Sequence, residues 1–272
     1  MSIFQAILIA ILEGLTEFLP ISSTAHMVFL SSVFGIEKDE FVKMFQVSIQ
    51  FGAILAVVFL YWRKFFNFKG INFYVKLACA VVPALVLGYF FDDAIESVLE
   101  KPVPIAIVLI VGGIILLFVD AYFKNPQILK EEDISLPKAI KIGFWQCLAM
   151  MPGTSRAAAS IIGGMQQKLS RETAAEFSFF LAVPTMLAVT AYSVFLKKWT
   201  HNGLTEKGYQ MIMADNHHIQ LFVLGNVIAF VVAVIAIKLF IGVIKKYGFK
   251  IWGWYRIVIG SILLAYFLQS GL

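Results

Sequence analysis

The chain has 272 residues, of which 60% are hydrophobic and only 14% are charged. So few charged side chains cannot cover the surface of a soluble globule of this size, and the composition predicts an integral membrane protein. The formal net charge of +5 is carried mainly by short loops between apolar segments, where basic residues set membrane orientation, so it does not indicate a nucleic-acid partner.

Six segments are apolar over the roughly 20 residues that a helix needs to cross a bilayer. They cover residues 41–62, 71–91, 103–122, 174–196, 218–244 and 251–268. The loops after the first and fifth segments are basic and are expected to be cytoplasmic; they carry Arg63, Lys64, Lys69 and Lys76, and Lys245, Lys246 and Lys250. The loop after the second segment is acidic and is expected outside; it carries Asp92, Asp93, Glu96 and Glu100. Aromatic residues at segment ends predict an interfacial belt; they are Tyr61, Trp62, Trp199, Trp252, Trp254 and Tyr255.

Two further apolar stretches, residues 3–34 and 139–165, are interrupted in the middle. Pro20 and a Ser-Ser-Thr run break the first stretch, and Pro152-Gly153 breaks the second. Each half has only about 10 to 14 residues, which suits a re-entrant hairpin better than a full crossing. With this reading the first hairpin enters from outside and the second from the cytoplasm.

The two breaks coincide when the sequence is shifted by 132 residues, which places Pro20 on Pro152 and Ser23 on Ser155. Interrupted helices in inverted repeats are common in secondary transporters, with a site where the broken elements meet. We therefore expect an all-α polytopic membrane protein with six transmembrane helices and two re-entrant helical hairpins in an inverted-topology repeat. One membrane domain covers residues 1–272, with the first repeat at about 1–123 and the second at about 135–272.

Residues 12–27, LEGLTEFLPISSTAHM, place two acids in the first half-helix. Glu13 and Glu17 are four residues apart and share a helix face, so both stay ionised there only with a cation between them. Mg²⁺, or another divalent ion such as Ca²⁺, fits this pair, and a shared proton, a water-filled transport path or a lysine partner are the alternatives. The hydroxyls of Ser22, Ser23 and Thr24 and the imidazole of His26 follow within the same motif. They either cap and pack a helix or supply a nucleophile and a proton-transfer group.

Residues 151–160, MPGTSRAAAS, have the composition of an anion cradle. Gly153 permits a turn, Thr154 and Ser155 offer hydroxyls at a helix start, and Arg156 offers a bidentate cation. The alternative is an ordinary capped helix whose arginine reaches the membrane surface. Together the two motifs predict metal-assisted phosphoryl transfer. A lipid flippase or secondary transporter that binds phosphate without hydrolysis is the rival of another class.

The segments EGLTEFLPISSTAH and PGTSR resemble the two signature regions of the undecaprenyl-diphosphate phosphatase family, the bacitracin-resistance membrane phosphatases. The resemblance extends over the whole chain in length, spacing and hydropathy. It implies hydrolysis of undecaprenyl diphosphate to undecaprenyl phosphate and inorganic phosphate with a divalent cation, which recycles the carrier lipid for peptidoglycan synthesis. It also implies a multi-pass protein of the bacterial cytoplasmic membrane whose active site faces the outer side. A homodimer is left open.

At the matching positions, this chain has the residues that correspond to the family's two acids, its hydroxyl, its histidine and the core of its second motif. Together with the chemistry of these side chains, the resemblance implies catalytic roles for Glu17, Ser23, His26 and Arg156. Substrate phosphate is assigned to Ser22, Thr24, Gly153, Thr154, Ser155, Arg156 and Ser160, and metal to Glu13 and Glu17. The chain departs from the family pattern with Ala25 before the histidine, and with Ala157, Ala158, Ala159 and Ser160 after the arginine, so that only Ser160 retains a hydroxyl there. The nucleophile is left open between Ser23, His26 and water.

Overall fold

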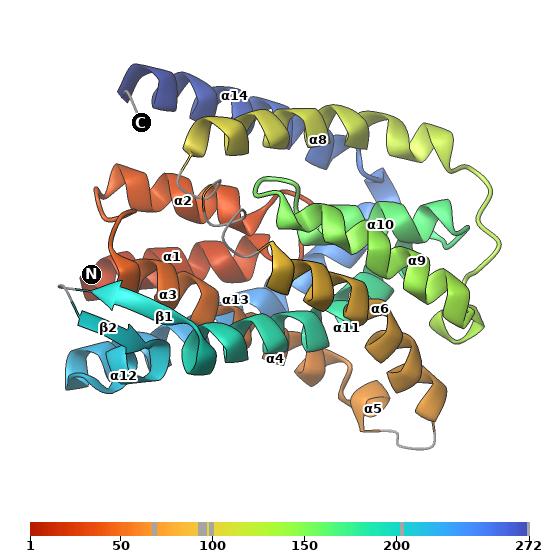
Figure 1. The fold of residues 1–272 in the computed structure, drawn as a ribbon. Coiled ribbons are helices and arrows are strands. Elements are labelled where there is room, and N and C mark those ends of the chain that lie inside the picture. Colours follow the sequence, from red (N-terminus) through yellow and green to blue (C-terminus); the bar gives the residue numbers. More distant parts are fainter. Residues whose placement is uncertain (67–69, 92–96, 98–100, 202–203, 271–272) are drawn as a thin grey trace.

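The computed structural model describes residues 1–66, 70–91, 97, 101–201 and 204–270, and these are almost entirely helical (Figure 1). The helices are α1 (Ile3–Thr16), α2 (Ser23–Val33), α3 (Glu40–Ser48), α4 (Gln50–Leu60), α5 (Trp62–Phe65), α6 (Ile71–Phe90), α8 (Pro102–Tyr122), α9 (Leu136–Gln146), α10 (Arg156–Gln166), α11 (Arg171–Ala191), α12 (Gly208–Met213), α13 (Asn216–Tyr247) and α14 (Lys250–Ser270). Short 3₁₀ turns cover Glu131–Asp133 and Cys147–Met150, and a π turn, Tyr192–Leu196, extends α11. Strand β1 (Lys198–His201) pairs antiparallel with β2 (Leu204–Lys207).

Six helical segments of the described chain are long and apolar enough to cross a membrane, as the sequence predicts. They are Glu40–Leu60, Ile71–Phe90, Pro102–Tyr122, Arg171–Leu196, Asn216–Tyr247 and Lys250–Gln269. Five of them begin one to three residues earlier than hydropathy indicates, and three of these five have a polar cap that hydropathy excludes; these caps are Asp39, Ser170 and Asp215.

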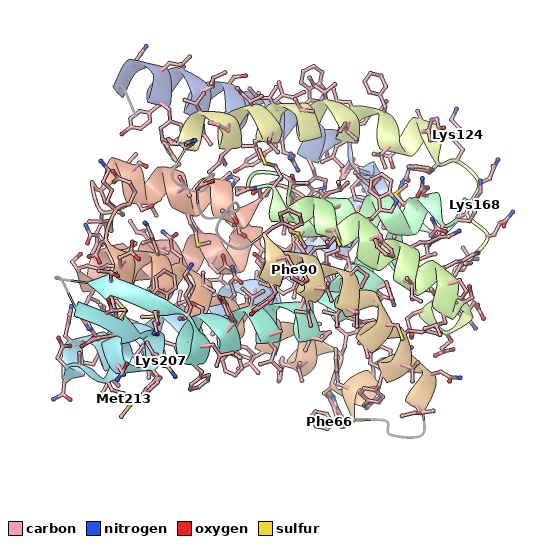
Figure 2. The ribbon with its side chains drawn as sticks, viewed as in Figure 1. Phe66, Phe90, Lys124, Lys168, Lys207 and Met213 are labelled. Carbon is pink, nitrogen blue, oxygen red and sulfur yellow. The ribbon has the colours of Figure 1, made fainter. Side chains whose placement is uncertain are left out.

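Most of the basic residues that we assigned to loops lie in helices: Arg63 and Lys64 on α5, Lys245 and Lys246 in the last turn of α13, and Lys250 at the start of α14. Lys76, which we assigned to a cytoplasmic loop, lies inside α6, and its Nζ donates to the carbonyl oxygens of Glu131 and Glu132 at 3.3 and 2.8 Å. The acidic residues of the second loop and one basic residue of the first lie outside the described residues; they are Asp92, Asp93, Glu96, Glu100 and Lys69. Figure 2 shows Lys124 and Lys168 at one end of the molecule and Lys207 and Met213 toward the other.

Both interrupted stretches break where the sequence predicts. Helix α1 ends at Thr16 and α2 begins at Ser23, while α9 and its 3₁₀ extension end at Met150 and α10 begins at Arg156. The residue that caps each restarted helix is a serine with a positive backbone φ, 68° at Ser22 and 74° at Ser155. The structure thus pairs Ser155 with Ser22, whereas the sequence shift pairs it with Ser23. Non-glycine residues rarely adopt such angles, and the cost is on the order of 1–3 kcal/mol each.

The helices pack so that both breaks lie in the interior. In Figure 1, α8 and α14 run side by side along one edge of the molecule, next to α2. Helix α1 packs on α13, which also packs on α4, and α10 lies against α9 and α11. Apolar residues from α4, α10, α11 and α13 form the main core. Two further buried clusters join α1 and α3 to α13, and α2 to α8 and α14, and many other apolar side chains of the spans are exposed, which matches a lipid environment.

Close helix contacts depend on glycine, and α4 against α13 offers a matched test. A Cβ at Gly52 would overlap the Asn226 carbonyl oxygen, and the Gly52 amide donates to Asn226 Oδ1 at 2.8 Å. Gly52→Ala is expected to destabilise the protein by about 1–3 kcal/mol, because α4 must move away from α13. Gly242 has open space around it. Gly242→Ala is therefore expected to be neutral or stabilising by up to about 1 kcal/mol through helix propensity.

Apparent melting temperatures of the two variants in detergent measure the difference. Equal melting temperatures for Gly52→Ala and wild type would show that α4 and α13 do not pack this closely.

Candidate active site

A cavity of about 1090 Å³ lies where the two breaks meet. Its walls come from both loops and from parts of α2, α3, α6, α10 and α11. The structure brings these predicted site residues to its wall: Glu17, Ser22, Ser23, Thr24, Gly153, Ser155 and Arg156. Four other predicted residues, Glu13, His26, Thr154 and Ser160, do not line it. Residues more than 130 positions apart in the sequence therefore share one chamber.

Each loop presents the start of a helix to this chamber. Ser22 Oγ accepts the Ala25 amide at 3.4 Å, and Ser155 Oγ accepts the Ala158 amide at 3.2 Å. Ser155 Oγ also donates to the Leu19 carbonyl oxygen at 3.4 Å, which joins the loops directly. The first-turn amides of α2 and α10 carry partial positive charge, and two such ends beside one cavity favour an anionic ligand there.

Glu17 lies at the centre of the polar wall. Its Oε2 accepts a hydrogen bond from Ser23 Oγ at 2.5 Å, and its Oε1 pairs with Arg156 Nη2 at 3.1 Å. The side chains of Glu17 and Arg156 are 6% and 11% exposed, so water screens this ion pair poorly. One carboxylate therefore contacts both a hydroxyl, whose proton it is placed to accept, and a guanidinium that forms an ion pair with it.

Arg156 is held on its other side by α11. Its Nη1 donates to the carbonyl oxygen and Oγ of Ser178, at 2.9 and 3.2 Å, and its Cζ lies 5.6 Å from the centre of the Phe18 ring. Ser160 lies behind Arg156, fully buried, and shares a hydrogen bond of 2.6 Å with Ser178 Oγ. Arg156 Nε is buried and has no hydrogen-bond partner among the described residues. Arg156 lines the cavity, with its guanidinium held between Glu17 and Ser178.

His26 faces away from the cavity. Its Nδ1 lies 2.7 Å from the Ser22 carbonyl oxygen and its Nε2 lies 2.9 Å from Tyr255 Oη. The His26 and Tyr255 rings are stacked, with centroids 5.7 Å apart. Tyr255, which we predicted as part of the interfacial belt, also contacts a predicted catalytic residue.

Glu13 lies behind Glu17, and its environment bears on the predicted metal. Glu13 has no exposed surface, and neither carboxylate oxygen has a hydrogen-bond partner among the described residues. A buried carboxylate in this state is costly unless a proton or a cation neutralises it. The described residues contain no group of three or more histidine, cysteine or acidic side chains that could hold a metal. Mg²⁺ is commonly held by one or two carboxylates with water and substrate phosphate, so the pair of acids fits that ion.

Several residues that line the cavity were not predicted from the sequence. Gln146 lines the cavity with its Oε1 buried and unpartnered among the described residues, while its Nε2 donates to Thr185 Oγ1 at 3.1 Å. Lys38, Lys43 and Lys197 also line it. Ser178 does not line it but binds Arg156. The only signal for Ser178 and Thr185 in the sequence is a polar residue inside an apolar span, which is common without function.

The chain matches known proteins along almost its whole length. A family model described as "Bacitracin resistance protein BacA" matches residues 6–262. A protein of Flavobacterium psychrophilum named undecaprenyl-diphosphatase is 52% identical over 97% of this chain and 95% of its own length. Proteins with the same name from Flavobacterium johnsoniae and Porphyromonas gingivalis are 49% and 46% identical. These matches cover 97% and 99% of this chain, and 96% and 98% of the relatives.

Proposed function

The chain belongs to the BacA family of bacitracin resistance proteins, and on that premise we propose that it hydrolyses undecaprenyl diphosphate to undecaprenyl phosphate and inorganic phosphate. The reaction recycles the carrier lipid for peptidoglycan synthesis, and it lowers the amount of the diphosphate form that bacitracin captures. The observation that carries the proposal is the double contact of Glu17, which binds Ser23 and Arg156 at one cavity wall. A flippase that only binds the lipid does not require a carboxylate hydrogen-bonded to a hydroxyl. The relatives are also named for hydrolysis of this lipid diphosphate.

In the proposed reaction Ser23 Oγ attacks the terminal phosphorus atom of the diphosphate, and its proton passes to Glu17 Oε2. The bond from that phosphorus to the bridging oxygen breaks, and undecaprenyl phosphate leaves with the proton from Glu17. A phosphoserine remains. Glu17 then takes a proton from the water that attacks the phosphoserine, and Ser23 Oγ recovers this proton as inorganic phosphate leaves. His26, hydrogen-bonded to the Ser22 carbonyl, orients the loop that carries Ser23.

Charge on the transferred phosphoryl group is stabilised by the second loop. Arg156 and Ser155 line the same cavity as Ser23, and together with the first-turn amides of α10 they are the donors for that charge. Glu13 and Glu17 are the residues that would hold Mg²⁺. When bound, this ion supplies Lewis-acid neutralisation of the diphosphate.

The two broken helix pairs, α1 with α2 and α9 with α10, form the proposed re-entrant hairpins of an inverted repeat. Two observations support this: both halves are short, and both restart at a positive-φ serine cap. We place the site toward the outer side of the cytoplasmic membrane. The cavity wall includes Lys38 before α3, Pro102 at the start of α8 and Trp199 after α11. Charge in the loops predicts an outer location for each of these three positions.

Purified protein in detergent, supplied with a polyprenyl diphosphate, tests the function. We expect inorganic phosphate to be released with Mg²⁺ and release to fall at least about a hundredfold when a chelator removes the ion. Re-addition of Mg²⁺ is expected to restore the rate. A folded sample that binds the lipid and releases no phosphate under any of these conditions would refute hydrolysis and favour a carrier. Release that is indifferent to chelation would refute only the metal.

A further inference from the structure

Arg256, on α14, is the most deeply buried cation of the described chain. It has no exposed surface, and no carboxylate among the described residues pairs with it. Its guanidinium instead donates to five backbone carbonyl oxygens, those of Pro20, Val108, Leu109, Gly153 and Thr154, at 2.9 to 3.4 Å. An unpaired buried charge is costly, so this arrangement persists only because the carbonyl dipoles replace its hydration.

The five acceptors belong to the first loop, the second loop and α8. Pro20 lies two residues before the cap Ser22, and Gly153 lies two residues before the cap Ser155. Arg256 Nη1 donates to Pro20 and Thr154, which belong to different loops, and Nη2 donates to Gly153. One guanidinium therefore holds equivalent points of both loops. The remaining two acceptors fix it to α8.

The neighbouring helix makes room for this contact. A Cβ at Gly112 of α8 would overlap Arg256 Nη2. The residue before Arg256, Tyr255, contacts His26 of the first loop's helix. Tyr255 thus contacts the His26 side chain and Arg256 the backbone of both loops, although neither residue lines the cavity itself.

We propose that Arg256 is the positioning residue that fixes the two cavity loops against each other. It keeps Ser22 and Ser155 in their positive-φ conformations and so aligns Ser23 of one loop with Arg156 of the other. For its catalytic consequence this inference rests on the proposed function. A displacement of about 1 Å between reacting groups can lower a rate about a hundredfold, so a positioning residue that touches no substrate still affects turnover.

Hydrogen exchange and kinetics of Arg256→Lys test the proposal. Lysine keeps the charge but replaces a planar fork of donors with a single ammonium, which cannot reach both loops in the same way. We expect peptides over residues 18–27 and 151–160 to exchange at least about tenfold faster together, with the remaining helices unchanged. We expect kcat to fall about a hundredfold with KM within about threefold of wild type.

Two further variants separate positioning from general destabilisation. Gly112→Ala, which displaces the guanidinium without changing Arg256, is expected to accelerate exchange in the same two loops. Gly52→Ala, which loosens α4 far from Arg256, is expected to lower the melting temperature with kcat within about threefold of wild type. Faster exchange in one loop only, or throughout the protein, would overturn the proposal. The exchange readout does not depend on hydrolysis, so it decides this inference even where the phosphate assay fails.

Discussion

Ser23→Ala is expected to lower phosphate release by at least about a thousandfold, because it removes the group that attacks phosphorus. Binding of the lipid diphosphate is expected to stay within about threefold of wild type, since Arg156 and the amides of both helix starts remain. Turnover and equilibrium binding of a polyprenyl diphosphate, measured on the same detergent-purified sample, separate the two quantities. Acid quenching of wild type during turnover, followed by peptide mass analysis, is expected to find phosphate on the peptide that contains Ser23.

Ser48→Ala is the matched control. Ser48 is equally buried, donates only within its own helix region to Met44, and does not line the cavity. It is expected to retain full turnover. If Ser23→Ala kept a tenth or more of the wild-type rate, attack would belong to water, and Ser23 would be a binding residue.

Arg156→Ala is expected to lower kcat by about a thousandfold, a loss typical of removing a charged donor from a phosphoryl-transfer site. The variant loses two contributions: the donor for the transferred phosphoryl group and the ion pair that holds the Glu17 carboxylate in place. Arg156→Lys restores the charge without the bidentate fork, and we expect it to recover part of the rate, to within about a hundredfold of wild type. Initial rates at saturating lipid measure both.

Arg63→Ala is the control for this pair, because Arg63 lies on α5 and far from the cavity wall. It is expected to leave kcat unchanged. A loss in Arg156→Ala confined to KM would contradict the assignment, because it would mean that Arg156 binds the ground state and the transition state equally.

The local breaks were predictable because their causes are local. Pro20 and Pro152 lack a backbone donor, and Gly153 adopts a φ of 94° that other residues avoid, so their combination with polar residues favours a break, whereas Pro83 and Pro184 are accommodated within α6 and α11. Charged residues within apolar stretches are rare enough that Glu17 and Arg156 stood out from the sequence alone. We predicted that the two motifs form one site, and the 3.1 Å ion pair between Glu17 and Arg156 joins them directly.

The roles of individual polar residues were less accessible. Glu13 and Glu17 share a helix face by their spacing, yet only packing against α13 and the second loop places Glu17 at the cavity and Glu13 behind it. Ser160 retains the hydroxyl of its motif, but the same packing directs it to Ser178 and away from the cavity. Spacing along one helix cannot distinguish a residue that lines a cavity from the next one on the same stripe.

Arg256 is the clearest example of a residue whose role could not be predicted from the sequence. In the sequence it is a basic residue near the start of an apolar segment, a position that ordinarily indicates the membrane interface. In the structure it is fully buried and binds carbonyl oxygens 236 and 103 positions away in the chain. The sequence by itself determined the membrane class, the six spans and the two breaks, because these depend on hydropathy and on backbone restrictions at single residues. Only the tertiary structure decided which side chains share the chamber and what holds its loops, because those contacts depend on how distant helices pack.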